Sequence, residues 1–502
     1  MEQLINKDKL PERIKRNKKN IYIALGMLIF TLIICSNFLK VHFAQDTYCV
    51  YYDGWNQYIK VFLTSSRIFS ALLLGIAKIF HFSLETTIII SSILTILFFT
   101  MAWYILYRYT IKLIKKDNNI YDNLLVIGIS FLIVFNFCTF ELTVFIESGM
   151  MALSVLLSVI SACLFSSRKY VKSFILLILA SWGYQSSIGL FVLITLVFIA
   201  YKDKDNLKNI LKKAICVFIF WGVIMLLNLL VSKGFAIFFK VTQRQTTMLN
   251  FSEIINTVVK YVKFILIDNI DVGFKYWYLS VIVIISILFI VLFTKNRKYF
   301  NIFEYVILIL VSILIPIAPI LTMPISSQYM VPRMCITFGS ILGILLLYLF
   351  IIMKPNNVKI VEKIVTILVI VLFVVNSIYF IRGSSENIAT GYLDKNVAGS
   401  ILNQINKYER ESGIKIKNIG IMFDSECTTY YNSQPSMGSA TVRSMITDWA
   451  VIPALEYYGQ VKYNMVYDIP EEIKSEFSAK SWDYYSDEQL AFDGDTLYLC
   501  LF

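Results

Sequence analysis

Apolar segments of about 20 residues recur along this chain, and short loops rich in lysine and arginine separate many of them. A segment of that length can cross the hydrocarbon core of a bilayer as a helix. The composition agrees, because 57% of the 502 residues are hydrophobic and only 16% are charged. Soluble domains have about 45 to 50% apolar and about 25% charged residues. The chain is therefore predicted to be a polytopic membrane protein.

The basic surplus, 46 Lys and Arg against 34 Asp and Glu, does not indicate a nucleic-acid partner. The cations recur between apolar runs rather than within a nucleic-acid-binding signature, so they are interpreted as topology signals of a chain embedded in membrane lipid. The eight cysteines are scattered singly, without metal or redox spacing. His42 and His81 each stand alone near a membrane edge. No metal or other cofactor is expected.

Lys/Arg-rich loops near span ends stay in the cytoplasm, which orients the segments. The basic tail, residues 1–20, is placed inside, residues 67–82 form a helix at or dipping into the outer face, and 254–266 are amphipathic. The predicted membrane segments are 21–40, 85–107, 123–137, 150–165, 173–201, 214–233, 277–294, 303–322, 333–353 and 364–381. This gives about nine or eleven spans, with positions 115 and 204 inside and 427 outside.

The segment 173–201 is interrupted by G-Y-Q-S-S at 183–187, although basic, cytoplasmic loops flank both of its ends. It must be a re-entrant loop or two short helices, with Tyr184 and Gln185 deep in the membrane or at its outer face. Irregular polar backbone at such depth is tolerated only where protein or a water-filled cavity surrounds it. A polar break is therefore predicted inside the protein.

From Arg382 onward charged residues become frequent and turn formers appear. The chain is thus divided into a transmembrane domain, 21–381, and a water-facing extracytoplasmic α/β domain, 382–502. Helices are expected at 394–410 and 450–458, and strands at 419–423 and 496–502. Cys427 and Cys500 both fall in this domain, where the sequence is equally compatible with a disulfide and with two thiols.

Ionisable and polar groups at the outer membrane edge are functional candidates, because their desolvation is costly. The candidates are Asp46, Asp53, Arg67, Glu141, Glu147, Tyr184, Gln185, Lys240, Arg244 and Arg333. A carboxylate opposite such cations suits transfer of a group from a phosphate-linked lipid: it acts as general base on an acceptor hydroxyl, while Arg or Lys neutralises the departing phosphate. Each group alone is equally compatible with a solvated loop charge or an internal ion pair.

Aromatic residues crowd around the two aspartates, namely Tyr48, Tyr51, Tyr52, Trp55 and Tyr58. They suit the faces of sugar rings, and an interfacial aromatic belt explains them equally well.

Short motifs along nearly the whole chain resemble one known family. They are Gln45-Asp46, Ser66-Arg67, N-F-C-T-F-E (136–141), E-S-G-M-M-A-L-S (147–154), G-Y-Q-S-S (183–187), S-Q-Y-M-V-P-R (327–333) and the terminal D-G-D-T-L-Y-L-C-L-F. In this order they are similar to the Gtr-type serotype-converting glucosyltransferases, which decorate bacterial surface polysaccharides. The resemblance implies the GT-C membrane fold and a polyprenyl-phosphate sugar as donor.

Residue by residue, the resemblance makes Asp46 the catalytic base, Arg67 the arginine that follows it, and Glu141 the acid of the second outer loop. It makes Tyr184 and Gln185 the membrane-embedded pair. The family usually has paired acids where this chain has Asp46-Thr47, and Gly-Arg where it has Ser66-Arg67. The choice of base between Asp46 and Asp53 therefore stays open.

The resemblance thus implies inverting transfer of a hexose, glucose as in the family, from undecaprenyl phosphate to a cell-envelope glycan outside the cytoplasm. The dispersed acids and the cations Arg67, Lys240, Arg244 and Arg333 favour phosphate binding without a metal. A surface-polysaccharide polymerase is the nearest alternative. A lipid-linked sugar flippase or transporter predicts repeated halves and midplane charges, and the sequence shows no repeat and few such charges. The sugar, the acceptor, the linkage and the oligomeric state stay open.

Overall fold

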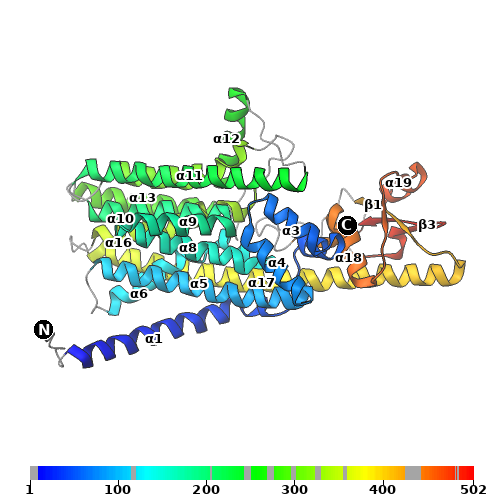
Figure 1. Cartoon of the computed structure of the whole chain (residues 1–502), viewed down its shortest axis with the longest axis horizontal. Helices are drawn as coiled ribbons and strands as arrows, with labels where there is room; N and C mark the ends of the chain where they lie inside the picture. The colour runs from blue at the N-terminus through cyan, green and yellow to red at the C-terminus, as the bar shows by residue number, and fades with distance from the viewer. Residues whose placement is uncertain are drawn as a thin grey trace.

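The computed structural model describes residues 9–501 apart from 115–119, 204–205, 242–249, 268–275, 296–300, 323–329, 354–358, 424–441, 481 and 483–484. Across these residues the chain forms an elongated helical bundle with a small α/β domain at one end (Figure 1). The helices up to the middle of the chain are α1 (Lys9–Ile34), α2 (Gln45–Asp53), α3 (Trp55–Thr64), α4 (Ile68–Ile79), α5 (Leu84–Ile114), α6 (Ile120–Val134), α7 (Phe137–Phe140), α8 (Ser148–Ser166), α9 (Tyr170–Gly183), α10 (Ile188–Lys202) and α11 (Leu207–Phe239). They are followed by α12 (Phe251–Leu266), α13 (Trp277–Lys295), α14 (Ile302–Ile317), α15 (Ile336–Gly339), α16 (Ile341–Met353) and α17 (Lys359–Ser412).

Seven helical segments in the described part of the chain are long and apolar enough to cross a membrane, or eight if one bent pair counts as a span. That pair, 120–134 with 137–144, bends by 55°. The chain is therefore a multi-pass helical membrane protein, as predicted. The count of about nine or eleven spans stays a prediction, because shorter apolar helices such as α4, α9 and α14 fall below that length.

The predicted break in 173–201 is confirmed as two short helices, α9 and α10, joined by a 3-10 turn at Gln185–Ser187. At one end of the bundle Lys202 Nζ donates to the carbonyl of Ser166, 2.5 Å away. At the other end Gln185 contacts the turn between α3 and α4. The pair thus begins and ends at the same end of the bundle. The predicted helix at 67–82 is confirmed as α4.

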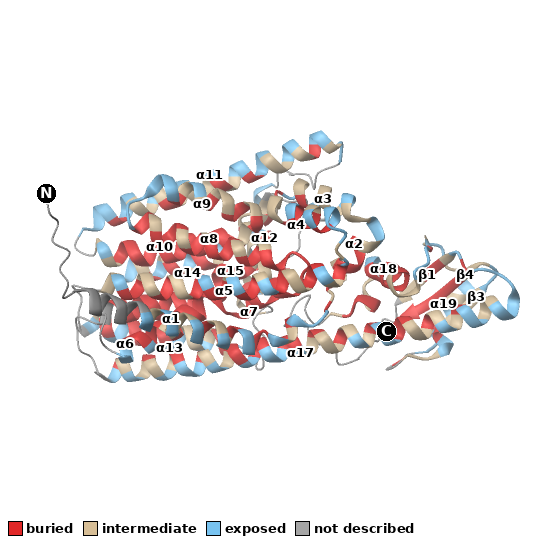
Figure 2. Cartoon of the chain, turned by 60° about the horizontal axis from the view of Figure 1, so that its bottom comes forward, coloured by how far each residue is buried: buried red, intermediate tan, exposed pale blue. Residues whose placement is uncertain are grey.

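Small residues let the central helices approach closely. Ser91 Oγ lies 3.1 Å from Ser148 Oγ and accepts a hydrogen bond from the Gly149 amide at 2.8 Å, so α5 and α8 meet backbone to backbone. Small residues at helix interfaces are typical of membrane bundles, where lipid tails give no hydrophobic drive for association. Buried residues concentrate in the middle helices, while α11 exposes leucine and isoleucine side chains (Figure 2). Those exposed apolar side chains suit contact with lipid.

Helix α17 has 54 residues and is therefore about 80 Å long, far more than the roughly 30 Å of a bilayer core. It leaves the bundle and packs along the terminal domain (Figure 1). The boundary predicted at Arg382 falls inside this helix, and the helix predicted at 394–410 is part of it.

The terminal domain contains a four-stranded sheet in the order β2-β1-β4-β3. Its elements are β1 (Asn418–Phe423), α18 (Asp448–Gly459), β2 (Asn464–Val466), α19 (Glu471–Ser478), β3 (Leu490–Asp493) and β4 (Thr496–Leu501). Strand β1 pairs in parallel with β2 and β4, and β3 is antiparallel to β4. The predicted strands and the helix at 450–458 are confirmed. Cys500 is buried in β4, whereas Cys427 lies outside the described residues, so a disulfide between them stays a prediction.

Candidate functional site

Two arginine–glutamate pairs lie at the end of the bundle that faces the terminal domain. Arg67 Nη1 is 3.2 Å from Glu147 Oε1, and Arg333 Nη1 is 2.8 Å from Glu141 Oε1. The backbone amide of Arg333 also donates to Glu141 Oε2, at 2.6 Å. Both glutamate side chains are buried, while those of Arg67 and Arg333 are 24% and 13% exposed. The carboxylates thus hold two guanidinium groups that reach accessible space.

The break between α9 and α10 lies between the two pairs. The guanidinium carbon of Arg67 lies 5.0 Å from the centre of the Tyr184 ring, within cation–π range. Gln185 Nε2 donates to the carbonyl of Ser65 at 2.7 Å, and Ser186 Oγ donates to the carbonyl of Arg333 at 2.9 Å. The polar break therefore holds the backbone on both sides of the site, and Gln185 is engaged with the protein itself.

Asp46 stands in the first turn of α2, half-buried. It makes no hydrogen bond or ion pair with any residue that the structure describes. The pKa of Glu147 is raised, chiefly by burial. The Arg67 charge acts against this rise, and the Asp46 charge adds to it. Burial also raises the pKa of Tyr58, again reinforced by Asp46. Asp46 is thus close enough to both groups to act on them electrostatically. Within the described part of the chain it has no cationic partner.

Asp53 ends the same helix, about two turns or 10 Å further along one face. Its side chain is exposed, and burial raises its pKa while Lys462 lowers it. The two candidate bases therefore differ in surroundings, because Asp46 lies near Glu147 and Tyr58, whereas Asp53 lies near Lys462 of the terminal domain.

The terminal domain holds the helix that carries Asp46, which the sequence did not indicate. Gln45 Nε2 donates to Thr447 Oγ1 at 3.0 Å, and the hydroxyls of Tyr48 and Tyr458 are 2.8 Å apart. Lys462 Nζ donates to the carbonyl of Tyr52 at 3.2 Å. Tyr48 and its neighbour Tyr51 pack their rings against Tyr457 of α18. These tyrosines of α2 therefore serve domain packing.

A buried ion pair joins the segment just before α18 to α17. Asp394 accepts hydrogen bonds from Arg443 Nε at 3.2 Å and from the amide of Ser444 at 2.7 Å. The Arg443 side chain is 1% exposed. Because α17 begins in the bundle, this pair connects the membrane helices to the surface on which α2 rests.

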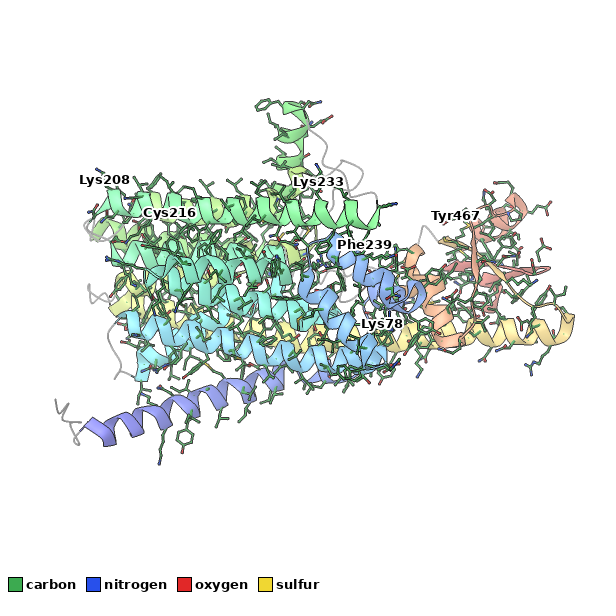
Figure 3. The ribbon with its side chains drawn as sticks, in the orientation of Figure 1. Lys78, Lys208, Cys216, Lys233, Phe239 and Tyr467 are labelled. Atoms are coloured by element: carbon green, nitrogen blue, oxygen red, sulfur yellow. The ribbon has the colours of Figure 1, made fainter. Side chains whose placement is uncertain are left out.

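Two predicted site residues are not placed with the others. Lys240 is exposed just after Phe239, at the C-terminal end of α11 (Figure 3), and no hydrogen bond or ion pair joins it to the arginine pairs in the described part of the chain. Arg244 lies outside the described residues. Conversely, Asn228 and Ser232 of α11 contact the turn before Arg67, and only their polarity within an apolar span would have indicated this from sequence.

Neither models of known protein families nor the curated proteins give a match to this chain. The function therefore has to be inferred from the chemistry of the site. That chemistry combines a carboxylate that has no cationic partner among the described residues with two fixed guanidinium groups, at the end of the bundle next to the terminal domain.

Proposed function

We propose that this protein is a membrane glycosyltransferase that moves a hexose, glucose by the family resemblance, from a polyprenyl-phosphate donor to a cell-envelope glycan on the extracytoplasmic side. One observation carries the proposal: Asp46 has no protein partner among the described residues, yet it lies beside the Arg67–Glu147 pair. A carboxylate whose oxygens are not occupied by a protein cation can accept a hydrogen bond from an acceptor hydroxyl. Guanidinium groups bind phosphate oxygens through several N–H donors.

In the proposed reaction Asp46 accepts the proton of an acceptor hydroxyl. The hydroxyl oxygen forms a bond to the anomeric carbon of the donor sugar. The bond from that carbon to the phosphate oxygen breaks, and its electron pair leaves with polyprenyl phosphate. Arg67 and Arg333 stabilise the charge that develops on the phosphate, while Glu147 and Glu141 orient them. No metal takes part in this proposal.

The backbone before Arg67 supports the family resemblance. Ser66 has a φ of 60°, in the left-handed region that favours glycine. The Gtr-type enzymes usually carry glycine at this position, so the local geometry accords with their Gly-Arg pair. Membership of that family and the GT-C fold are part of the proposal.

Substitution of the two aspartates tests the catalytic role. Asp46→Asn preserves size and hydrogen bonding but removes basicity, so transfer of radiolabelled glucose from its polyprenyl phosphate should fall by roughly 10²- to 10⁴-fold. Asp53→Asn is the matched control on the same helix and should change transfer far less. The opposite ranking would make Asp53 the base, and full activity of both variants would refute a catalytic role for α2.

Mass analysis of surface glycans from cells with and without the gene tests the function itself. Loss of one hexose per repeat unit, with chain length unchanged, is the expected result. Shortened chains would instead identify a polymerase. Unchanged glycans in every fraction would refute the transferase proposal.

A further inference from the structure

Each of the three residues before Arg67 is held by a side chain from another element. The carbonyl of Thr64 accepts a hydrogen bond from Ser232 Oγ at 2.5 Å, and the carbonyl of Ser65 accepts one from Gln185 Nε2 at 2.7 Å. Ser66 Oγ donates to Asn228 Oδ1 at 3.0 Å. The turn between α3 and α4 is thus fastened at consecutive positions to α11 and to the α9–α10 break.

The turn needs such support because its backbone is strained. Ser66 adopts a φ of 60°, a conformation that Cβ makes unfavourable for residues other than glycine. Strained residues persist where the surroundings determine them, and they gather at functional sites. The amide of Arg67 donates to the carbonyl of Phe62 at 2.8 Å across this turn, so the direction in which Arg67 leaves the backbone depends on it.

Asn228 is an unusual residue for its place on α11. It is only 6% exposed, on a helix whose neighbouring leucines face outward, and its Nδ2 has no hydrogen-bond partner in the described structure. Buried polar groups without partners are costly, and polar residues within membrane helices are functional candidates. Ser232 lies one turn further along the same face.

We propose that Asn228, Ser232 and Gln185 form a three-point clamp that positions Arg67 for the phosphate of a polyprenyl-phosphate lipid. The inference rests on the proposed function and deepens it, because it assigns a phosphate-binding task to α11. Gln185, predicted from sequence as a substrate contact, becomes a positioning residue. The clamp acts through Arg67: with the turn released, the guanidinium loses its fixed direction toward the phosphate.

A double-mutant cycle on lipid binding tests this. Purified protein in nanodiscs is titrated with undecaprenyl phosphate. Asn228→Leu should weaken binding about tenfold, and Arg67→Ala roughly 10- to 100-fold, as expected for charge-assisted contacts. In the Arg67→Ala background, Asn228→Leu should have almost no further effect, because coupled residues are not additive. An equal loss in both backgrounds would overturn the proposal.

Matched controls come from α17, where Asn376 Nδ2 and Ser377 Oγ donate to carbonyls of their own helix. Ser232→Ala should weaken lipid binding, because it releases the Thr64 carbonyl. The matched variants Asn376→Leu and Ser377→Ala should leave lipid binding unchanged. Hydrogen exchange of the Ser65 and Arg67 amides measures the clamp without any lipid: it should accelerate in Asn228→Leu and stay unchanged in Asn376→Leu. Unchanged exchange in Asn228→Leu would overturn the clamp, whereas wild-type protein that binds no undecaprenyl phosphate would overturn the donor in the proposed function as well.

Discussion

The site's carboxylates differ in what surrounds each of them. Glu141 and Glu147 each lie within ion-pair distance of a guanidinium group, so their carboxylate oxygens are already engaged with arginine. Asp46 has no such partner in the described structure and is only half-buried. Among these three acids, Asp46 is therefore the one whose carboxylate is open to an acceptor hydroxyl, while the glutamates orient the two arginines.

The two glutamates should differ in their contribution to stability. Glu141→Gln removes the buried carboxylate charge that faces the half-buried Arg333 and weakens two hydrogen bonds, so a loss of up to about 3 to 5 kcal/mol is expected. Glu147→Gln should cost less, because the Arg67 side chain is more exposed, at 24% against 13%. Thermal unfolding of both variants in detergent gives the comparison. Equal losses would contradict this ranking.

His42 should make stability depend on pH. Burial lowers the pKa of His42 below the usual 6.5. Hydrogen bonds to the backbone of Lys40 and Thr143 favour the charged form but do not outweigh burial. The unfolded chain therefore binds a proton at a pH where the native chain does not, so stability is complete above about 6.5 and falls as the pH drops below it.

The non-titrating variant His42→Asn isolates this effect, since the Asn amide can still donate to the Lys40 carbonyl that Nδ1 contacts at 2.9 Å. Wild-type protein should lose up to about 1.4 kcal/mol per pH unit more than the variant below pH 6.5. Thermal unfolding between pH 7.5 and 5.5 measures the difference. Parallel curves for the two proteins would show that His42 does not titrate in this range.

At the scale of elements, the close approach of α8 and α9 at Gly183 sets the position of the polar break. A Cβ at Gly183 would lie 2.6 Å from the Met150 carbonyl oxygen and 2.9 Å from Ser154 Cβ. Gly183→Ala should therefore displace the end of α9 together with Tyr184, which stacks on Arg67. We expect a loss of about 1 to 3 kcal/mol and reduced transfer.

Gly391→Ala on α17 is the control, because a Cβ there meets nothing within 4 Å. In a helix interior this change should be neutral or stabilising by up to about 1 kcal/mol. Thermal unfolding and the transfer assay on both variants compare them. A Gly183→Ala protein that behaves like Gly391→Ala would show that this contact does not position the break.

Elements governed by local patterns could be predicted from the sequence, and contacts between distant segments could not. The break at 183–187 is visible because polar residues interrupt an apolar run between basic loops, and β1 and β4 because their apolar runs are short. The continuity of α17 through Arg382 could not be predicted, because the charged residues that become frequent there are equally typical of the end of a membrane helix. The contact of Gln45 with Thr447 follows from tertiary packing alone.

For the whole molecule, the arrangement separates two ends of different character. Lys208, in the basic first turn of α11, lies at one end of the molecule, and Tyr467 of the terminal domain lies at the other (Figure 3). Contacts of Lys202 with Tyr109 and Ser166 place further loops at the first end, whereas Gln185, Arg67 and Arg333 gather at the second. Segments that the charge rule assigned to one side of a membrane thus lie together in space.

If the basic end faces the cytoplasm, the site and the terminal domain face outward. The sequence predicts the membrane side of positions 115, 204 and 427, but these lie outside the described residues. Exposed residues within the described part of the chain offer the better test.

In a Cys427→Ser background, Tyr467→Cys should react with a membrane-impermeant maleimide in intact cells, because Tyr467 is 82% exposed. Lys208→Cys should react only after permeabilisation. The background protein controls for the native cysteines, which are mostly buried in the described structure. The reverse labelling pattern would place Asp46 and both arginine pairs in the cytoplasm, and transfer to an extracytoplasmic glycan would then be ruled out.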